Sequence, residues 1–298
     1  MRYILENEYL KVEIDSFGAE VKSVYGKKNH IEYMWCGDKK YWGRTAPVLF
    51  PFVGSLKNKE YKYEGKTYVM GQHGFARDME HGLVSQSKTE IEFKLCANED
   101  TKEKYPFDFQ LCIGYQLDGN RIRVIWKVIN QDNKTMYFSI GAHPAFNCPL
   151  ESDEDKNGYS LYFGGVDKII HHGNDVGTGL ALRENLTLPL ENHMAKITPG
   201  FFDRCTYMVE GKQTQEVGLV DKSGKRYVTM YFDAPLFAIW SPEGKNAPFV
   251  CIEPWYGRCD AEDFEGELQE REYTNTLQVG QNFETSYEIA YDREYEYA

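Results

Sequence analysis

Apolar and polar residues alternate along much of this 298-residue chain. Over residues 10–15, for instance, Leu, Val and Ile alternate with Lys, Glu and Asp. Because successive side chains of a β-strand point to opposite faces, a period of two predicts strands with one buried face and one face in water. The same pattern recurs at 91–95, 109–117, 122–128 and 227–233. The sequence therefore predicts a protein built mainly from β-strands.

Turn-forming residues separate the predicted strands. Asp118-Gly119-Asn120 stands between two long alternating segments, which predicts a β-hairpin. Similar turn sequences occur at 16–18, 64–66 and 222–225. A helical period of about 3.6 residues is scarce, and 258–270 is the segment in which we expect a short helix.

The sequence shows no sign of a boundary between two domains. No repeat of fixed length and no linker rich in Ser, Pro and Gly divides the chain. All-β chains of more than about 200 residues can form one domain. We therefore expect residues 1–298 to form a single all-β domain, a large antiparallel sandwich of β-sheets.

Composition narrows the choice of partner. Aromatic residues make up 15% of the chain, which suits both strands and stacking against sugar rings. The net charge of −12 argues against a nucleic-acid backbone or an anionic membrane, because both attract Lys and Arg. The longest apolar run, at 47–56, is too short to cross a bilayer. We expect a small-molecule ligand, and neither nucleic acid nor membrane as partner.

Cysteine usage and the first residues indicate the compartment. The chain has seven cysteines, an odd number, and no Cys-x-x-Cys motif. Free thiols in reducing surroundings therefore fit better than a disulfide framework. Residues 1–15 are charged from Arg2 onward and lack the apolar core of a signal peptide. We expect a cytoplasmic protein, and the sequence does not predict its oligomeric state.

Two segments imitate metal-binding motifs. Residues 153–158 resemble the start of a calcium-binding EF-hand loop, but the position where such a loop needs its last glutamate is Gly164. His171 and His172 are adjacent, so on a strand they point to opposite faces and cannot bind one ion together. We therefore expect neither a metal nor any other cofactor.

A carboxylate and two histidines are suited to proton transfer. An apolar run at 249–252 leads into Glu253 and Pro254, which predicts a carboxylate at the end of a strand in apolar surroundings. Loss of hydration raises the pKa of such a carboxyl group, so that Glu253 could act as a base near neutral pH. A histidine is the natural acid partner, because its ordinary pKa lies near 6.5. His73 stands in the segment HGFAR and His143 in GAHPAF. A single residue of this kind is more often structural, so the joint pattern carries the hypothesis.

These motifs resemble those of the aldose 1-epimerase (galactose mutarotase) family, in the branch that holds the LacX-type proteins and the glucose-6-phosphate 1-epimerases. The matching segments follow one another along nearly the whole chain: Arg44 to Gly54, HGFAR at 73–77, GAHPAF at 141–146, FFDRCTYM at 201–208 and IEPW at 252–255. The resemblance implies a β-supersandwich, a large fold of two antiparallel sheets with an open carbohydrate cleft.

The resemblance also implies roles for individual residues. His143 matches the general acid that protonates the ring oxygen of a sugar, and Glu253 matches the general base that takes the proton from the C1 hydroxyl. His73 matches a second histidine, which binds near the ring oxygen. Asp203 matches an aspartate that hydrogen-bonds to sugar hydroxyls. Arg44 and Arg77 match arginines that face the substrate.

An acid–base pair suffices for mutarotation, because ring opening needs one proton removed from O1 and another delivered to the ring oxygen. The sequence therefore predicts an isomerase that interconverts the α and β anomers of a hexose. The arginines also fit a hexose 6-phosphate, although Arg44-Thr45-Ala46 stands where phosphate-using relatives favour Arg-Gly-Gly. A sugar-binding protein without catalysis is a further alternative on the same fold. A glycoside hydrolase would need two working carboxylates and would leave the histidines without a role.

Overall fold

The computed structural model describes residues 1–150 and 155–291, and the structural statements below concern these residues. Residues 153 and 154 of the acidic segment 153–158 lie outside this set. The described chain is mostly β-structure in antiparallel sheets, as the alternating pattern predicts. None of its helices has the length and apolar character needed to cross a membrane.

The largest sheet has nine strands. In spatial order these are β18 (Met194–Lys196), β15 (Ser160–Phe163), β20 (Glu216–Val220), β21 (Arg226–Phe232), β25 (Asn282–Ala290), β11 (Arg121–Asn130), β10 (Phe109–Asp118), β9 (Glu90–Cys96) and β8 (Gly82–Gln86). The predicted hairpin is confirmed, since β10 and β11 pair up to Asp118 opposite Arg121. Along β11 every second residue is buried, so the alternation in the sequence divides core from solvent.

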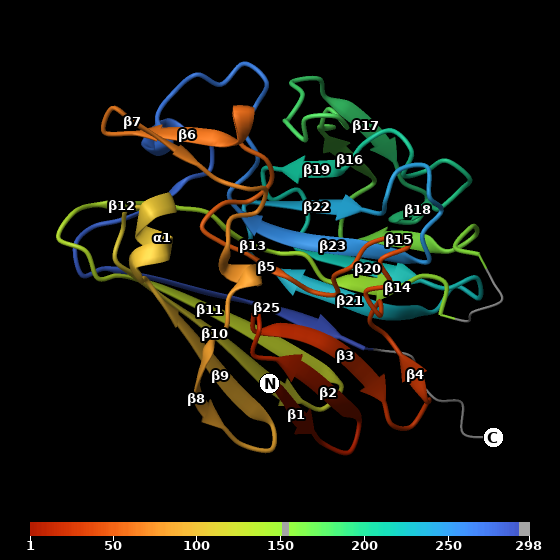
Figure 1. The fold of residues 1–298 in the computed structure, drawn as a ribbon. Coiled ribbons are helices and arrows are strands. Elements are labelled where there is room, and N and C mark those ends of the chain that lie inside the picture. The colour runs from red at the N-terminus through yellow and green to blue at the C-terminus, as the bar shows by residue number, and fades with distance from the viewer. Residues whose placement is uncertain (151–154, 292–298) are drawn as a thin grey trace.

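A second sheet packs against one half of the first, beside β15, β20 and β21 (Figure 1). Its strands in order are β19 (Tyr207–Glu210), β22 (Leu236–Trp240), β23 (Phe249–Tyr256), β13 (Ile140–Ala142) and β5 (Val48–Leu49), and β14 (Ala145–Asn147) also pairs with β23. The central strand of this sheet is β23, which carries the predicted base Glu253.

Smaller sheets complete the β-structure. A four-stranded sheet contains β1 (Arg2–Glu6), β2 (Leu10–Asp15), β3 (Glu20–Gly26) and β4 (Ile31–Glu32). Three two-stranded sheets pair β6 (Glu60–Tyr63) with β7 (Lys66–Val69), β12 (Met136–Phe138) with β24 (Asn275–Leu277), and β16 (Lys168–His171) with β17 (Leu186–Pro189). The predicted turns at 16–18, 64–66 and 222–225 join β2 to β3, β6 to β7 and β20 to β21.

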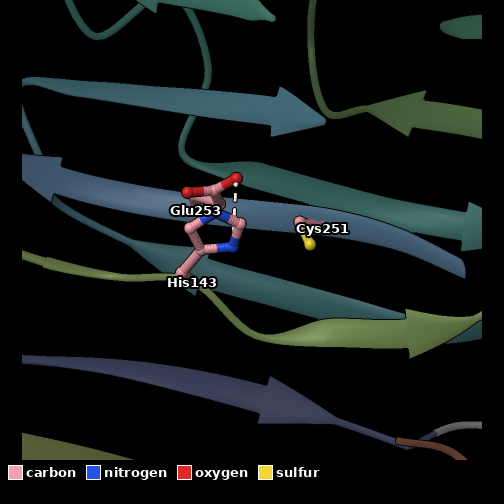
Figure 2. A group of neighbouring side chains, drawn as sticks. All are labelled: His143, Cys251 and Glu253. Atoms are coloured by element: carbon pink, nitrogen blue, oxygen red, sulfur yellow. Dashed lines mark ion pairs between the residues drawn. The ribbon is translucent and has the colours of Figure 1, made fainter. Parts of the chain in front are cut away.

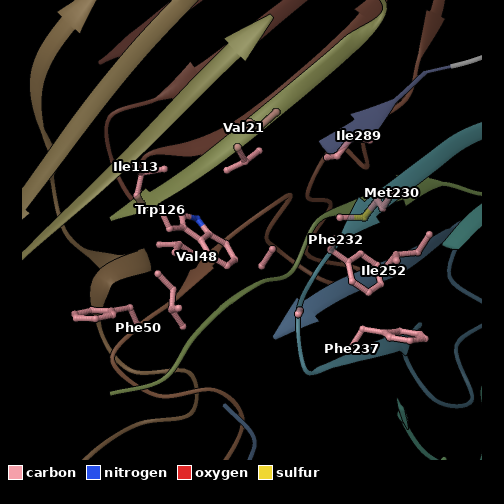
Figure 3. Packing of buried hydrophobic residues seen from close by; sticks show 14 of the residues in the cluster. Val21, Val48, Phe50, Ile113, Trp126, Met230, Phe232, Phe237, Ile252 and Ile289 are labelled. Atoms are coloured by element: carbon pink, nitrogen blue, oxygen red, sulfur yellow. The ribbon is translucent and has the colours of Figure 1, made fainter. Parts of the chain in front are cut away.

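The main core lies between these sheets. Figure 3 shows Trp126 of β11, Phe232 of β21 and Ile252 of β23 with their side chains in the space between the strands. One cluster of buried apolar residues extends from Leu5 to Tyr291 and draws on all three larger sheets. Because β23 contributes to this cluster, the strand that carries the predicted base is anchored in the centre of the molecule.

The helix expected over 258–270 is wrong, since only a 3₁₀ turn at Leu268–Glu270 forms there. Backbone N–H groups of this segment donate hydrogen bonds to distant parts of the chain. Asp260 N–H donates to the carbonyl of Ser55 at 3.0 Å, and Glu262 N–H donates to the carbonyl of Ala181 at 3.2 Å. These bonds replace the i to i−4 bonds of a helix. The α-helix of the described chain is α1 (Glu99–Lys104), and further 3₁₀ turns lie at Lys57–Lys59 and Ala76–Asp78.

Candidate active site

The strand β23 presents different residues to its two faces. Val250 and Ile252 point into the main core, whereas Cys251 and Glu253 share the opposite face. All residues from Phe249 to Trp255 are buried, so alternation of polarity could not reveal the two faces. The prediction that the strand ends at Glu253 is wrong, because β23 continues to Tyr256.

Pro254 is tolerated in this central strand because the neighbouring ladder is interrupted beside it. The two short strands β13 and β14 pair with the two ends of β23 in one common register. That register places His143, in the link between β13 and β14, directly opposite Glu253. In the described chain this link forms no ladder pairs with β23, and Pro144 in it has no N–H to donate. The interrupted ladder therefore brings an acid and a base to one point.

The side chains of His143 and Glu253 lie side by side (Figure 2). Both line one cleft. Nδ1 of His143 lies 3.4 Å from Oε1 of Glu253, and the side chains are 9% and 1% exposed. The distance is that of an ion pair, but within the described chain neither His143 Nδ1 nor Glu253 Oε2 has a partner in hydrogen-bond geometry. Both groups are therefore close together and still able to bond to a third.

Burial sets the protonation of this pair. Burial, with a smaller effect of Arg77, lowers the pKa of His143 to about 3. Burial also raises the pKa of the Glu253 carboxyl well above its usual range, against a smaller opposing effect of the Trp255 indole N–H. That N–H acts on the carboxyl without reaching hydrogen-bond geometry with any described residue. Both shifts oppose charge, so burial favours a neutral imidazole beside a protonated carboxyl group, a pair that holds one titratable proton.

Two tryptophans fix the orientation of His143. The ring of Trp42 stacks on the imidazole with 4.6 Å between centroids and 26° between planes. The ring of Trp240, at the end of β22, meets it edge-on at 5.3 Å and 87°. One tryptophan therefore stacks on the imidazole and the other lies perpendicular to it, and neither contact is a hydrogen bond to a ring nitrogen. They also give the cleft an apolar wall of the kind that packs against a sugar ring.

The backbone of Gly54 fixes His73. The N–H of His73 donates to the carbonyl of Gly54 at 2.9 Å, and the N–H of Gly54 donates to His73 Nδ1 at 3.0 Å. Because Nδ1 accepts, a neutral His73 carries its proton on Nε2. Burial, followed by the nearby Arg77, holds the pKa of His73 well below its usual value, so the ring stays neutral. A Cβ at Gly54 would lie 2.5 Å from the Cβ of Cys259, so this position requires glycine. His73 is therefore a fixed neutral hydrogen-bond donor.

The two predicted arginines lie on different sides of the cleft wall. Arg77 lines the cleft, donates from Nη2 to the carbonyl of Gln72 at 2.8 Å, and keeps Nε without a hydrogen-bond partner among the described residues. Burial, followed by the charge of Arg44, lowers the pKa of Arg77 to about 10. Arg44 pairs with Asp78 at 2.8 Å. Arg44 lines an adjoining hollow of about 400 Å³, and Arg77 lines this hollow as well as the cleft.

The cleft has a volume of about 600 Å³, within the range of small-molecule sites. Of the residues predicted from the sequence, His73, Arg77, His143 and Glu253 line it together. The lining that the described chain provides does not include Asp203, an exposed residue whose Oδ1 accepts a hydrogen bond from the N–H of Gly244 at 3.1 Å. A role of Asp203 toward sugar hydroxyls stays a prediction.

Sequence reasoning missed several polar residues of the cleft. Asn174, Thr206 and Glu243 line it, and each is partly exposed. Glu243 accepts a hydrogen bond from the indole N–H of Trp240 at 3.3 Å, next to the wall that holds His143. Thr206 lies within the segment FFDRCTYM, from which only Asp203 was given a role, and Asn174 and Glu243 stand in none of the quoted motifs. All three reach the cleft from loops or strand ends whose position depends on the fold.

Comparison with known proteins places these features in a family context. The sequence profile of the family described as aldose 1-epimerase matches residues 1–278. A chromosomally encoded LacX protein of Lactococcus lactis subsp. lactis is 34% identical over 261 residues, which are 85% of this chain and 87% of that protein. A galactose mutarotase related enzyme from Lactobacillus acidophilus has 34% identity and a TM-score of 0.93 over 99% of both chains.

A second solved structure extends the structural match. It is a galactose mutarotase-like protein from Lactobacillus casei, with 29% identity and a TM-score of 0.89. The match covers 97% of this chain and 99% of that chain. The all-β supersandwich that the motifs imply is therefore confirmed, because the superposition includes nearly every described strand.

Proposed function

The chain belongs to the aldose 1-epimerase family, and on that premise we propose that it is a mutarotase that interconverts the α and β anomers of a free hexose. His143 acts as general acid and Glu253 as general base. His73, Arg77 and the tryptophan wall position the sugar. One observation carries the proposal: the two titratable groups lie 3.4 Å apart, buried, at the floor of a cleft of about 600 Å³.

The reaction requires two proton transfers that this pair can make. In ring opening, Glu253 takes the proton from O1, His143 gives a proton to the ring oxygen, and the bond between C1 and that oxygen breaks. The C1–C2 bond then rotates, and the reverse transfers close the ring on the other face of C1. Atoms and charges balance at each step, and one fixed pair serves both directions.

The single proton of the pair fits both halves of this cycle. With the proton on His143, the pair is ready to open a ring; with the proton on Glu253, it is ready to close one. Burial favours the second arrangement in the free protein. Polar groups of a bound sugar, replacing lost hydration, would stabilise the first. His73 can donate from Nε2 to a sugar oxygen without exchanging its proton, because Nδ1 is already occupied by Gly54.

Anomer exchange measured by NMR on a panel of free and phosphorylated hexoses tests the proposal. Exchange spectroscopy detects interconversion at equilibrium, so no coupled enzyme is needed. We expect at least one free hexose to exchange much faster with protein than in buffer alone. A protein that binds a hexose but does not accelerate exchange would instead be a sugar-binding protein without catalysis.

The hollow beside the cleft favours a second candidate, a hexose 6-phosphate. Lys22, Arg44 and Arg77 line it, and arginine forks bind phosphate oxygens in pairs. These three cations already face two carboxylates, because Lys22 pairs with Glu20 at 3.1 Å, and Arg44 and Arg77 share Asp78 at 2.8 and 3.7 Å. One surplus positive charge is a weak match for a phosphate dianion, so the free sugar is preferred.

Arg77→Ala decides between the two substrates. The measurement is kcat/KM for glucose or galactose and for their 6-phosphates, in the wild type and in the variant. We expect both forms of the sugar to lose activity alike. A strong preference of the wild type for the 6-phosphate that disappears selectively in Arg77→Ala would establish the phosphate alternative. Lys22→Ala is the matched control, since it removes a cation from the hollow but not from the cleft lining.

A further inference from the structure

Cys251 brings a third donor atom to His143 and Glu253. A ring nitrogen of His143, the Sγ of Cys251 and a carboxylate oxygen of Glu253 all lie within 4.8 Å of one another. Cys251 and Glu253 are two residues apart on β23, so they project from the same face, and Figure 2 shows His143 reaching that face from the link between β13 and β14. The sequence did not predict this group, because its closeness depends on strand pairing.

The group is buried and incompletely bonded. His143 is 7% and Glu253 1% exposed, and within the part of the chain that the structure describes their Nδ1 and Oε2 atoms have no hydrogen-bond partner. Cys251 is fully buried and is a free thiol. Buried polar atoms are normally paired, so two unpaired ones on neighbouring side chains indicate a ligand. A sugar supplies partners for His143 and Glu253, but it has no use for the thiol.

The donor set selects the kind of ligand. Thiolate, imidazole and carboxylate together are ligands of zinc, whereas magnesium and calcium prefer oxygen donors. With bonds of about 2.0–2.3 Å in a tetrahedral site, neighbouring donor atoms are about 3.3–3.8 Å apart. His143 Nδ1 and Glu253 Oε1 are already 3.4 Å apart. The Cys251 thiol has to approach by about 1 Å, which a rotation of its side chain can supply.

We propose that His143, Cys251 and Glu253 form a zinc site at the floor of the cleft, with the fourth coordination position open to the cleft, and that zinc and sugar exclude each other. Binding releases the thiol proton and the proton held by the His143–Glu253 pair. Inhibition by zinc, which rests on the proposed function, follows because the ion occupies the acid and the base at once. Zinc binding itself does not depend on catalysis.

Cobalt(II) tests the site without any measurement of activity. Full-length protein, freed of metal with a chelator and dialysed, is titrated with Co²⁺. A bound thiolate gives a sulfur-to-cobalt charge-transfer absorption in the near ultraviolet, and tetrahedral coordination gives visible bands. We expect both signals to saturate at one ion per chain and to disappear when Zn²⁺ is added. A wild-type protein that never develops the charge-transfer band overturns the proposal, and this outcome needs no variant.

Cys251→Ser and its matched control Cys259→Ser locate the ion. Cys259 is also buried and lines the cleft, but its thiol contacts the sulfur of Met208. By isothermal titration with Zn²⁺, Cys251→Ser should weaken binding roughly tenfold or more and lose the charge-transfer band, since even indirect changes around a zinc site cost about 10–100-fold. Cys259→Ser should keep both. Wild-type affinity in Cys251→Ser would contradict the site. Replacing the exposed Cys36 and Cys96 by serine removes surface thiols from the measurement.

Kinetics test the mutual exclusion of ion and sugar. On a sugar that the protein epimerises, Zn²⁺ should raise KM and leave kcat unchanged, and Cys251→Ser should need more Zn²⁺ while its metal-free rate stays within about twofold of wild type. Equal inhibition of wild type and Cys251→Ser would overturn the exclusion. If no sugar is epimerised, the proposed function fails, and the cobalt spectrum still decides whether the site exists.

Discussion

His73 and His143 are both buried in one cleft, with ring centroids 5.5 Å apart, but they are held in different ways. His73 exchanges two hydrogen bonds with the backbone of Gly54. His143 is held by ring contacts, stacked on Trp42 and perpendicular to Trp240. No described residue offers its Nδ1 a hydrogen bond, although Glu253 is 3.4 Å away.

In the proposed mechanism this difference separates a fixed donor, His73, from a proton carrier, His143. A ring whose Nδ1 accepts a backbone N–H keeps its proton on Nε2, and protonating Nδ1 would break that bond. This fixed geometry comes with a left-handed backbone at His73, with φ 66°, a strained conformation that is uncommon outside glycine. Within the described residues Nδ1 of His143 has no hydrogen-bond partner, so a proton can be gained or lost there without breaking such a bond. Burial is common to both histidines, so the proposal that His143 and not His73 carries the proton rests on the partners of their ring nitrogens.

The largest effect is expected from removing the proton carriers. Glu253→Gln keeps the shape of the side chain but cannot take a proton, and His143→Asn cannot deliver one. Each should slow mutarotation of the best sugar by ~10²-fold or more, the lower range of general acid–base catalysis. The measurement is anomer exchange by NMR at saturating sugar. Full activity of either variant, with its fold verified by circular dichroism, would remove that residue from the mechanism.

A smaller effect is expected from His73→Asn. Asparagine tolerates a left-handed backbone, so the local fold should persist. The variant loses one neutral hydrogen bond to the sugar, worth about 1.4 kcal/mol or roughly tenfold in kcat/KM. The pH dependence of the rate should not change. A loss as large as that of His143→Asn, together with a shifted pH profile, would mean that His73 carries protons and that the contrast between the two histidines is wrong.

The pH profile of the wild type sharpens the contrast further. The active pair holds one proton, and it takes up a second only when His143 is protonated next to a neutral Glu253. Because burial lowers the pKa of His143 to about 3, kcat/KM should stay level through the ordinary histidine pKa of 6.5 and fall only in much stronger acid. Rates must be corrected for the acid-catalysed reaction in buffer. A decline centred near pH 6.5 would show that His143 titrates like an exposed histidine.

The smallest expected effect is on stability. Since the pKa of Glu253 is raised in the folded state, the wild type binds more protons than its unfolded chain above pH 4.5, and its stability falls as the pH rises through that window. Glutamine does not titrate, so the stability of Glu253→Gln does not fall for this reason as the pH rises. The difference in the free energy of unfolding, variant minus wild type, should therefore increase by more than about 1 kcal/mol from pH 4.5 to neutrality. Denaturant titrations of both proteins at the two pH values measure it. A pH-independent difference would mean that Glu253 is ionised in the folded protein.

Much of the β-structure could be predicted because half-buried strands alternate. The hairpin of β10 and β11 is an example, with its inner residues buried and its turn marked by Gly119. The strand β23 could not be resolved in the same way, because its residues from Phe249 to Trp255 are all buried and its only charged residue is Glu253. The helix α1 escaped notice because its six residues make too few turns for a helical period.

The chemistry of the site was predictable only in part. His73, Arg77, His143 and Glu253 stand in distinctive motifs, and the fold brings all four to the cleft. Cys251 looks like one more apolar strand residue, and only the pairing of β23 with β14 shows that it neighbours His143. The place of Asp203 could not be foreseen either, because a motif in a loop does not fix the direction in which the loop points.

The common register of β13 and β14 on β23 limits which insertions and deletions the protein can tolerate during evolution. An insertion or deletion of one residue in β23 would turn Glu253 toward the core, where it would meet the side chains around Ile252, so activity and folding would fail together. The loop at 174–179 also lines the cleft but belongs to no ladder of that sheet, so its length can vary without moving the pair. If the proposed mechanism holds, descendants of this chain can change their sugar specificity through this loop while the His143–Glu253 pair keeps its place.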